Sequence, residues 1–264
     1  MPEEGRYIYC IINADGRREF GPIGIGGHGD QVHSVCYREL AAVISSTKTM
    51  KYPVSRPNTI AHQRVMEEVM KDHVILPVRF DTIAESKKKR GVLVETHEQR
   101  IITQVLKSPY REFEDLLEEM SDKIELGVKG LWQDMDTIYA EIVRENTEVA
   151  RLNRRVKKMP SVQSQAERVR LGEMVKRALD EKKRVEESRV LGALKGLPVD
   201  WRQNKTFGDR MFMNDAFLIE TRQERGFDAA IDELNERYDG RMIFKYFGPV
   251  PLCNFVEIVV TWED

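Results

Sequence analysis

The sequence has few cysteines and no long apolar run. Its three cysteines, Cys10, Cys36 and Cys253, are widely spaced in strand-like segments, so they indicate neither a disulfide framework nor a metal site. No apolar run approaches the roughly 20 residues that a membrane-spanning helix needs. Residues 1–6 lack the basic and apolar regions of a secretory signal. We therefore expect a cytoplasmic protein that does not bind a membrane.

The sequence also lacks an excess of charge of either sign. Its 42 lysine and arginine residues nearly balance its 44 aspartate and glutamate residues, so no net field favours nucleic acid. Residues 87–90 are the only strong basic run, and no aromatic side chains alternate with them as in single-strand nucleic-acid sites. We interpret this run as a solvated connector and expect no nucleic-acid partner.

Local motifs for catalysis and for cofactor or metal binding are lacking as well. No serine stands in a Gly-x-Ser-x-Gly elbow, although distant residues can also assemble a triad. His28 and His33 have no cysteine or carboxylate at ligand spacing. Residues 24–29 have G-x-G-x-x-G spacing, but a strand-like segment follows where a dinucleotide site needs a helix. We expect no enzyme, no cofactor and no metal.

What the sequence does contain is ample apolar material, 41% of 264 residues, together with 33% charged residues. This composition is typical of a folded protein with much helical surface. We predict an α+β protein in which two α+β, ferredoxin-like parts are joined by a long antiparallel helical hairpin. The predicted domains are an N-terminal α+β domain, 1–133, a helical hairpin extension, 134–197, and a C-terminal ferredoxin-like domain, 198–264.

The N-terminal part is predicted to alternate between strands and helices. Strands are expected at 6–12, 31–37, 40–46, 74–80 and 122–132. One helix should begin at Asn58 as its N-cap, and a second, longer helix should extend over 90–120.

The middle part carries a heptad stripe of apolar residues over 135–159, broken only by Glu145. Pro160 interrupts the pattern, and Ser164 with Glu167 predicts a capping box at the start of a second helix that ends near Leu194. Two such helices pack antiparallel, and their charged outer faces predict a projecting arm. In the C-terminal part, a strand at 216–220, a helix at 227–238 and strands at 242–247 and 255–262 predict a ferredoxin-like sheet.

Residues 74–83 form the most informative segment. Its apolar, β-branched run predicts a strand, and Pro77 predicts that this strand lies at a sheet edge or contains a bulge. Arg79 lies between apolar neighbours, so its guanidinium either makes a structural salt bridge, bridging elements of the first domain, or contacts a partner.

This segment resembles the LPxRFxT-like segment of the gas vesicle protein F/L family (GvpF/GvpL), which follows a helix that begins near a histidine. The matching residues are His62, Leu76, Pro77, Arg79, Phe80 and Thr82. Further stretches agree in order and spacing, namely 7–9, 40–45, 125–129, 214–219, 247–251 and 254–256. The sequence departs from the family at Asp81, where glycine is frequent, and at Leu252 and Cys253, which replace a more aromatic pair.

The resemblance implies a non-enzymatic accessory or minor structural protein that binds the small shell protein and other accessory proteins during gas vesicle assembly. The residues that it marks for interaction are Leu76, Pro77, Arg79, Phe80, Thr82, Lys129, Phe247, Gly248, Pro249, Pro251 and Phe255. The prolines of 247–251 fit either a tight hairpin-like connection or a rigid interaction loop flanked by aromatic residues.

Two other functions are compatible with the sequence. A coiled-coil adaptor would use the helices of 134–197 to link accessory proteins without contacting the shell. A small-molecule-binding α+β protein would use the glycine-rich loop at 24–29.

Overall fold

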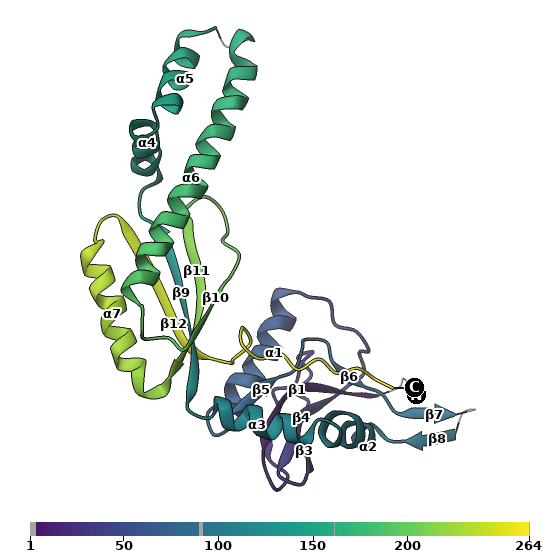
Figure 1. Cartoon of the computed structure of the whole chain (residues 1–264). Coiled ribbons are helices and arrows are strands. Elements are labelled where there is room, and N and C mark those ends of the chain that lie inside the picture. The colour runs from purple at the N-terminus through teal and green to yellow at the C-terminus, as the bar shows by residue number, and fades with distance from the viewer. Residues whose placement is uncertain (1–3, 90–91, 161, 264) are drawn as a thin grey trace. The chain divides into compact units, whose positions relative to one another are not determined.

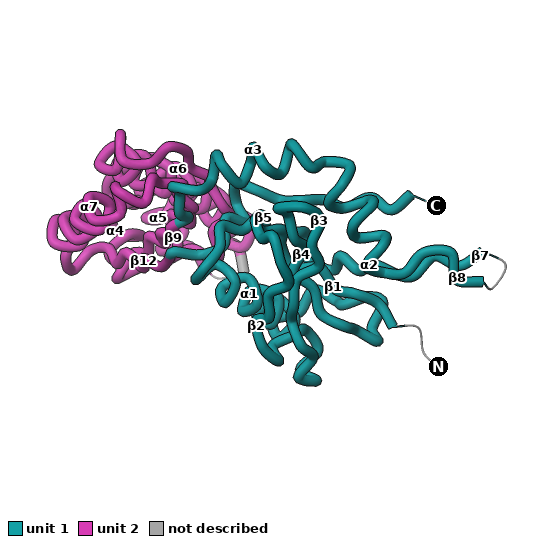
Figure 2. Tube along the Cα trace, turned by 90° about the horizontal axis from the view of Figure 1, so that it is seen from below, with its two compact units in different colours: residues 1–125, 249–264 teal, residues 126–248 magenta. Residues whose placement is uncertain are grey.

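The chain forms two compact units, each built from strands and helices (Figures 1 and 2). The computed structural model describes residues 4–89, 92–160 and 162–263. Unit 1 consists of residues 1–125 and 249–264, and unit 2 of residues 126–248. The predicted α+β class is therefore confirmed, whereas the division into domains 1–133, 134–197 and 198–264 stays a prediction.

Unit 1 contains most of the strands. Its elements in chain order are β1 (Gly5–Asn13), β2 (Glu19–Gly21), β3 (Val32–Tyr37), β4 (Leu40–Thr47), α1 (Arg56–Val69), β5 (Ile75–Pro77), β6 (Ile83–Ala84), β7 (Lys87–Lys89), β8 (Val92–Glu95), α2 (His97–Arg100), the π-helix η1 (Ile101–Lys107) and α3 (Tyr110–Met120). Four strands precede the first helix, so this connectivity departs from the β-α-β-β-α-β order of a ferredoxin-like domain.

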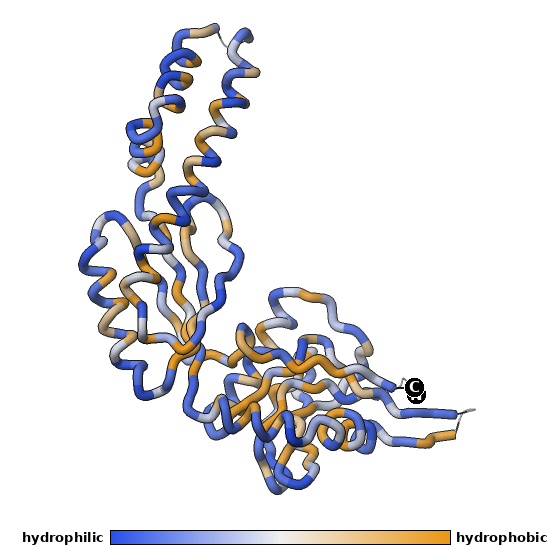
Figure 3. The backbone as a smooth tube through the Cα atoms, in the orientation of Figure 1, coloured by the Kyte–Doolittle hydropathy of each residue, from blue (hydrophilic) through white to orange (hydrophobic). Residues whose placement is uncertain are grey.

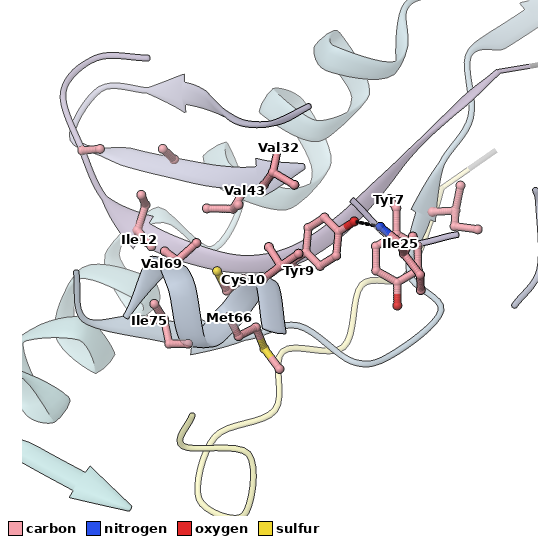
Figure 4. Packing of buried hydrophobic residues seen from close by; sticks show 14 of the residues in the cluster. Tyr7, Tyr9, Cys10, Ile12, Ile25, Val32, Val43, Met66, Val69 and Ile75 are labelled. Carbon is pink, nitrogen blue, oxygen red and sulfur yellow. Dashed lines mark hydrogen bonds between the residues drawn. The ribbon is translucent and has the colours of Figure 1, made fainter. Parts of the chain in front are cut away.

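The main sheet of unit 1 has the strand order β2-β3-β4-β1-β5, and β6 also pairs with β1. Strand β1 is apolar along most of its length because both of its faces are covered, and residues 7–12 are fully buried. Its pairing with β4 contains a bulge between Ile8 and Cys10. The bulge brings Tyr9 and Cys10 into the same hydrophobic cluster, together with Met66 and Val69 of α1 (Figure 4).

Two helix boundaries in unit 1 differ from prediction. Helix α1 begins at Arg56, with Ser55 rather than Asn58 as its N-cap, because proline is tolerated in a first helical turn. The helix predicted over 90–120 is instead the β7–β8 ribbon followed by α2, η1 and α3. Thr96 forms a capping box with Gln99 and starts α2, while Arg90 lies outside the described residues.

Strand β5 lies at the end of the sheet path, as Pro77 predicted. Beyond it, Val78 forms a parallel bridge with Ile258, and the Ile258 N–H donates to the Pro77 carbonyl at 2.8 Å. The prediction of a strand at 255–262 is therefore wrong. Within that segment only Ile258 forms a β-bridge.

Unit 2 contains β9 (Lys123–Trp132), which enters from unit 1, and then α4 (Met135–Glu145), α5 (Thr147–Lys158), η2 (Val162–Ser164), α6 (Gln165–Ala193), β10 (Asp200–Gln203), β11 (Met211–Glu220), η3 (Thr221–Gln223), α7 (Glu224–Arg237) and β12 (Met242–Val250). The sheet order is β10-β11-β9-β12, and α6 and α7 cover one face (Figure 1). The strand expected at 122–132 is β9, and it pairs between β11 and β12.

The helix predicted over 135–159 is two helices, α4 and α5, because Asn146 interrupts it. The Asn146 side chain accepts hydrogen bonds from the backbone N–H groups of Glu148 and Val149, both at 3.1 Å, and so caps α5. The apolar stripe is buried against α6 and includes Ile138, Ile142, Val149, Leu152 and Val156. Helix α6 starts at Gln165, but Ser164 Oγ accepts from Arg168 Nε instead of capping the helix.

Candidate functional site

The turn at residues 78–82 joins β5 to β6 and is fixed by hydrogen bonds on two sides. Toward β1, the Val78 N–H donates to the Tyr9 carbonyl at 3.0 Å and the Ile8 N–H donates to the Thr82 carbonyl at 2.9 Å. Toward the C-terminal segment, the Arg79 N–H donates to the Ile258 carbonyl at 2.9 Å. Inside the turn, Thr82 Oγ1 donates to the Arg79 carbonyl at 2.6 Å. The backbone of this family segment is therefore held firmly.

Two buried side chains, Tyr7 and His62, pack against the turn. The Tyr7 hydroxyl accepts the backbone N–H of Asp81 at 2.9 Å and lies 3.1 Å from His62 Nδ1. One hydroxyl oxygen thus connects the backbone of the turn to the imidazole ring. The Phe80 ring contacts His62 edge-on, with centroids 5.6 Å apart. The histidine and the motif phenylalanine, distant in sequence, thus belong to one cluster.

Asp81 has a backbone φ of 66°, in the left-handed region that favours glycine. Its Oδ1 accepts the backbone N–H of Tyr52 at 2.6 Å, and the Tyr52 hydroxyl lies 2.8 Å from Thr47 Oγ1. The departure from the frequent family glycine is thereby explained, because aspartate tolerates this conformation and adds a hydrogen bond.

The glycine-rich loop is tied to the same cluster. The Ile25 N–H donates to the Tyr9 hydroxyl at 2.7 Å, and that hydroxyl also lies 2.7 Å from Ser45 Oγ. Strand β3 follows the loop in the chain, where a dinucleotide site needs the start of a helix. The structure gives this loop a packing role on Tyr9.

Three titratable side chains of the cluster, His62, Tyr7 and Tyr9, are uncharged near neutral pH. Burial lowers the pKa of His62 to about 4 and raises the pKa of Tyr9 to about 12. Burial also raises the pKa of Tyr7 well above its ordinary range. These three neutral, buried side chains hold the backbone of the turn in place through hydrogen bonds and ring contacts.

Arg79 does not make the structural salt bridge expected of it. Its side chain is exposed, and within the described residues its guanidinium has no hydrogen bond or ion pair. Residues 75–78 are all buried, whereas Arg79 lies in the turn that follows them, where its side chain is exposed to solvent. Of the other motif residues in the segment, Leu76, Pro77 and Thr82 are buried and Phe80 is half-buried. Arg79 is thus the motif side chain that the turn presents to solvent.

A second group of predicted residues lies in unit 2, on β9 and β12. The Lys129 ammonium lies 5.0 Å from the centroid of the Phe247 ring, which is 42% exposed. A Cβ atom at Gly127 would lie 2.1 Å from Phe247 Cζ, so the ring rests directly on the Gly127 backbone. Gly248 follows with a φ of 136°, a value that glycine tolerates.

The predicted loop at 247–251 is largely strand, since β12 continues to Val250. Pro249 is exposed, Pro251 is buried and Phe255 is half-buried. Beyond this strand, Asn254 donates from its backbone N–H and from Nδ2 to the buried Glu125 carboxylate, at 3.0 and 2.5 Å. This contact joins two family stretches, 125–129 and 254–256, within unit 1.

Several residues of this arrangement were absent from the predicted set, namely Tyr7, Tyr52, Asp81, Gly127 and Glu125. A positive φ at Asp81 and the close approach at Gly127 leave only weak signals in one sequence. Among the described residues, no three histidine, cysteine, aspartate or glutamate side chains are grouped to hold a metal ion. None of the described helices combines the length and apolar character needed to cross a bilayer.

Comparison with solved structures identifies the fold. The crystal structure of the gas vesicle protein GvpF from Anabaena sp. PCC7120 superposes with a TM-score of 0.74 at 21% identity, covering 97% of this chain and 99% of that chain. The crystal structure of GvpF from Microcystis aeruginosa gives a TM-score of 0.70 at 20% identity, covering 95% and 98%. The fold is that of these gas vesicle proteins.

Sequence comparison assigns the family. The family described as gas vesicle synthesis protein GvpL/GvpF matches residues 5–257, and the chain belongs to it. Gas vesicle protein F1 of Halobacterium salinarum is 26% identical over 264 residues, covering 99% of this chain and 97% of its own length. Gas vesicle protein F of a Streptomyces species is 25% identical, covering 95% and 99%. This membership confirms the predicted resemblance and implies a role in gas vesicle formation.

Proposed function

We propose that this protein is a non-enzymatic accessory or minor structural protein of gas vesicles. It binds the small shell protein and other accessory proteins in the cytoplasm while the vesicle is assembled. The family match over residues 5–257 is the observation that carries this proposal. A role in binding also agrees with the site, because its exposed side chain is Arg79, whose guanidinium has no ion pair among the described residues.

The test is co-expression of the tagged protein with the small gas vesicle shell subunit, followed by pull-down. Wild type should retain the subunit, and Arg79→Glu should retain at least tenfold less if the turn is a contact. Arg64→Glu is the matched control, since Arg64 is another exposed arginine of unit 1. A strain that lacks the protein yet makes vesicles of normal number and shape would contradict the role in assembly.

A groove in unit 2 supports the adaptor as a second candidate. The groove, of about 820 Å³, lies along α4 and α6 and is lined mainly by charged side chains. Some of these are paired across the helices, as in Lys182 with Glu141 at 3.0 Å and with Glu145 at 2.8 Å. Arg144 and Arg177 also line it. If reversing both charges releases accessory proteins while Arg79→Glu is silent, the adaptor is favoured.

A further inference from the structure

Strands β7 and β8 form a two-stranded ribbon that is separate from the main sheet of unit 1 (Figure 2). They pair antiparallel, with Lys88 opposite Leu93 and Lys89 opposite Val92. In the described part of the chain, no third strand pairs with either of them. An isolated two-stranded ribbon is marginally stable in water and gains stability from a third strand. The ribbon is therefore an incomplete sheet.

The apolar side chains of β8 lie in solvent. Val92, Leu93 and Val94 are 66%, 53% and 59% exposed. A register shift between Lys87 and Lys88 gives β8 one residue more than its partner, so Val94 lacks a residue directly opposite. Figure 3 shows the contrast between a hydrophilic β7 and a hydrophobic β8. Consecutive exposed apolar residues on a free strand edge mark a place for another strand.

The base of the ribbon is fixed to the body of unit 1. Thr103 Oγ1 donates to the Glu95 carboxylate at 2.8 Å, and Arg100 Nη1 donates to the Glu85 carbonyl at 3.1 Å. The capping box at Thr96 then turns the chain directly into α2. A strand held at its base is partly ordered before it binds, which lowers the entropic cost of docking.

The positive charge of the ribbon favours a binding partner that carries negative charge. Its two strands carry three lysines, Lys87, Lys88 and Lys89, against a single glutamate, Glu95, which already accepts from Thr103. A second copy of the ribbon would bring six lysines together, which like-charge repulsion opposes. Carboxylates on an incoming strand would instead meet Lys87 and Lys89, and its apolar residues would cover Val92 and Val94.

We propose that the β7–β8 ribbon binds an extended segment of the shell subunit as a third strand, and that this segment combines apolar residues with aspartate or glutamate. This proposal rests on the proposed function and identifies the surface through which the protein would bind the shell subunit. Main-chain hydrogen bonds to the free edge supply affinity, while the lysines and the exposed aliphatic side chains supply selectivity.

Two double variants separate the apolar from the charged contribution. Val92→Thr with Val94→Thr keeps β-branched residues on the strand but removes apolar surface. Lys87→Glu with Lys89→Glu reverses the charge of β7. The matched controls are Val54→Thr and Lys51→Glu, at exposed positions elsewhere in unit 1. Circular dichroism and melting temperature establish that each variant is folded.

Binding is measured in two ways. In the pull-down with the shell subunit, each ribbon double variant should retain at least tenfold less subunit than wild type and both controls. In solution, a peptide that alternates valine and glutamate should bind wild type at least tenfold more tightly than a valine–lysine peptide of equal length. Hydrogen exchange should show the backbone amides of 87–89 and 92–95 becoming protected when the valine–glutamate peptide binds.

The possible failures are distinct. If wild type retains the subunit, both ribbon variants retain it equally and these amides stay unprotected, the ribbon proposal is overturned while the proposed function stands. If wild type itself does not retain the subunit, both are overturned. A concentration-dependent dimer that the valine double variant abolishes would assign the ribbon to a second copy of this chain and overturn the shell segment as its occupant.

Discussion

The Tyr7 hydroxyl and His62 Nδ1 lie 3.1 Å apart in the core of unit 1, although the two residues are 55 positions apart in the chain. The hydroxyl also accepts the Asp81 backbone N–H at 2.9 Å, so one oxygen connects the imidazole to the family turn. Protonating the imidazole would place a charge in this buried cluster, which burial disfavours. Burial therefore keeps His62 neutral near pH 7 and makes its protonation a source of pH dependence.

We expect the stability of unit 1 to fall on acidification because of His62. Burial lowers its pKa from 6.5 to about 4, so the unfolded chain binds more protons between these values. The free energy of unfolding should then decrease from pH 6.5 to pH 4, by about 3 kcal/mol if the whole shift is expressed. Urea denaturation at several pH values measures this slope. His62→Gln should flatten it and His28→Gln should not; an equal slope in all three proteins would reject the assignment.

Asp215 in unit 2 should produce the opposite pH dependence. Its carboxyl group is buried, and burial followed by the negative charge of Glu187 raises its pKa to about 7. The folded state binds more protons than the unfolded chain between its ordinary pKa and 7, so the contribution of Asp215 is lost as the pH rises through 7.

Asp215→Asn should therefore stabilise unit 2 by about 3 kcal/mol more at pH 8 than at pH 5, because the penalty of the buried carboxyl grows with pH until its folded-state pKa is passed. Hydrogen exchange of β11 amides reports on this unit separately from unit 1. Asp228→Asn, at a carboxylate that accepts from Tyr246 at 2.6 Å, provides a comparison that should not stabilise. A stabilisation by Asp215→Asn that is equal at both pH values would show that the carboxyl group does not titrate there.

Substitutions at Asp81 should follow both its backbone angle and its hydrogen bond. Asp81→Asn keeps a residue that tolerates φ of 66° and an acceptor for the Tyr52 N–H, so stability should change by less than about 0.5 kcal/mol. Asp81→Gly keeps the conformation but loses the acceptor, at about 1 kcal/mol. Asp81→Val loses both and should cost about 3 kcal/mol. Thermal or urea unfolding measures the stability of each variant. If Asp81→Val is more stable than Asp81→Gly, the cost assigned to the backbone angle is wrong.

Arg79→Ala should leave stability almost unchanged, within about 0.5 kcal/mol, because the side chain is exposed and its guanidinium is unpaired within the described residues. This outcome reverses the expectation from sequence that Arg79 bridges elements of the fold. Differential scanning calorimetry of Arg79→Ala beside Arg64→Ala decides between them. A melting temperature lowered by several degrees only at Arg79 would restore the structural role.

Two glycines of β9 should respond differently to alanine. At Gly130 the new Cβ would lie 2.4 Å from Cζ of Phe212, which is 1% exposed and enclosed by Trp132 and Phe244. Gly130→Ala should cost about 2–3 kcal/mol, because the ring has no space to enter.

At Gly127 the clash is with Phe247, whose ring is 42% exposed and can turn toward solvent. Gly127→Ala should cost about 1 kcal/mol or less and abolish the contact between Lys129 and Phe247. Urea unfolding gives both free energies. Equal losses at the two positions would show that Phe247 is as confined as Phe212.

Local patterns in the sequence were sufficient to predict those helices and strands whose structure depends on residues close together in the chain. The apolar run of β1, the strand β9 and the helix around Phe227 were all predicted, because burial on one or both faces imposes a pattern on the residues themselves. The motif at 76–82 was sufficient to indicate the family.

Long-range packing decided the rest. A run such as 92–94 has no local mark that distinguishes a strand edge from the apolar side of a helix, and here its pairing with β7 made it a strand. The apolar neighbours of Arg79 favour an internal partner, yet the turn that follows the buried residues 75–78 exposes its side chain. The sequence by itself determined the family and most elements, since these depend on residue type and spacing. Only the tertiary structure showed that Tyr7, His62 and Asp81 are in contact, because contacts between residues far apart in the chain produce no regular pattern in the sequence.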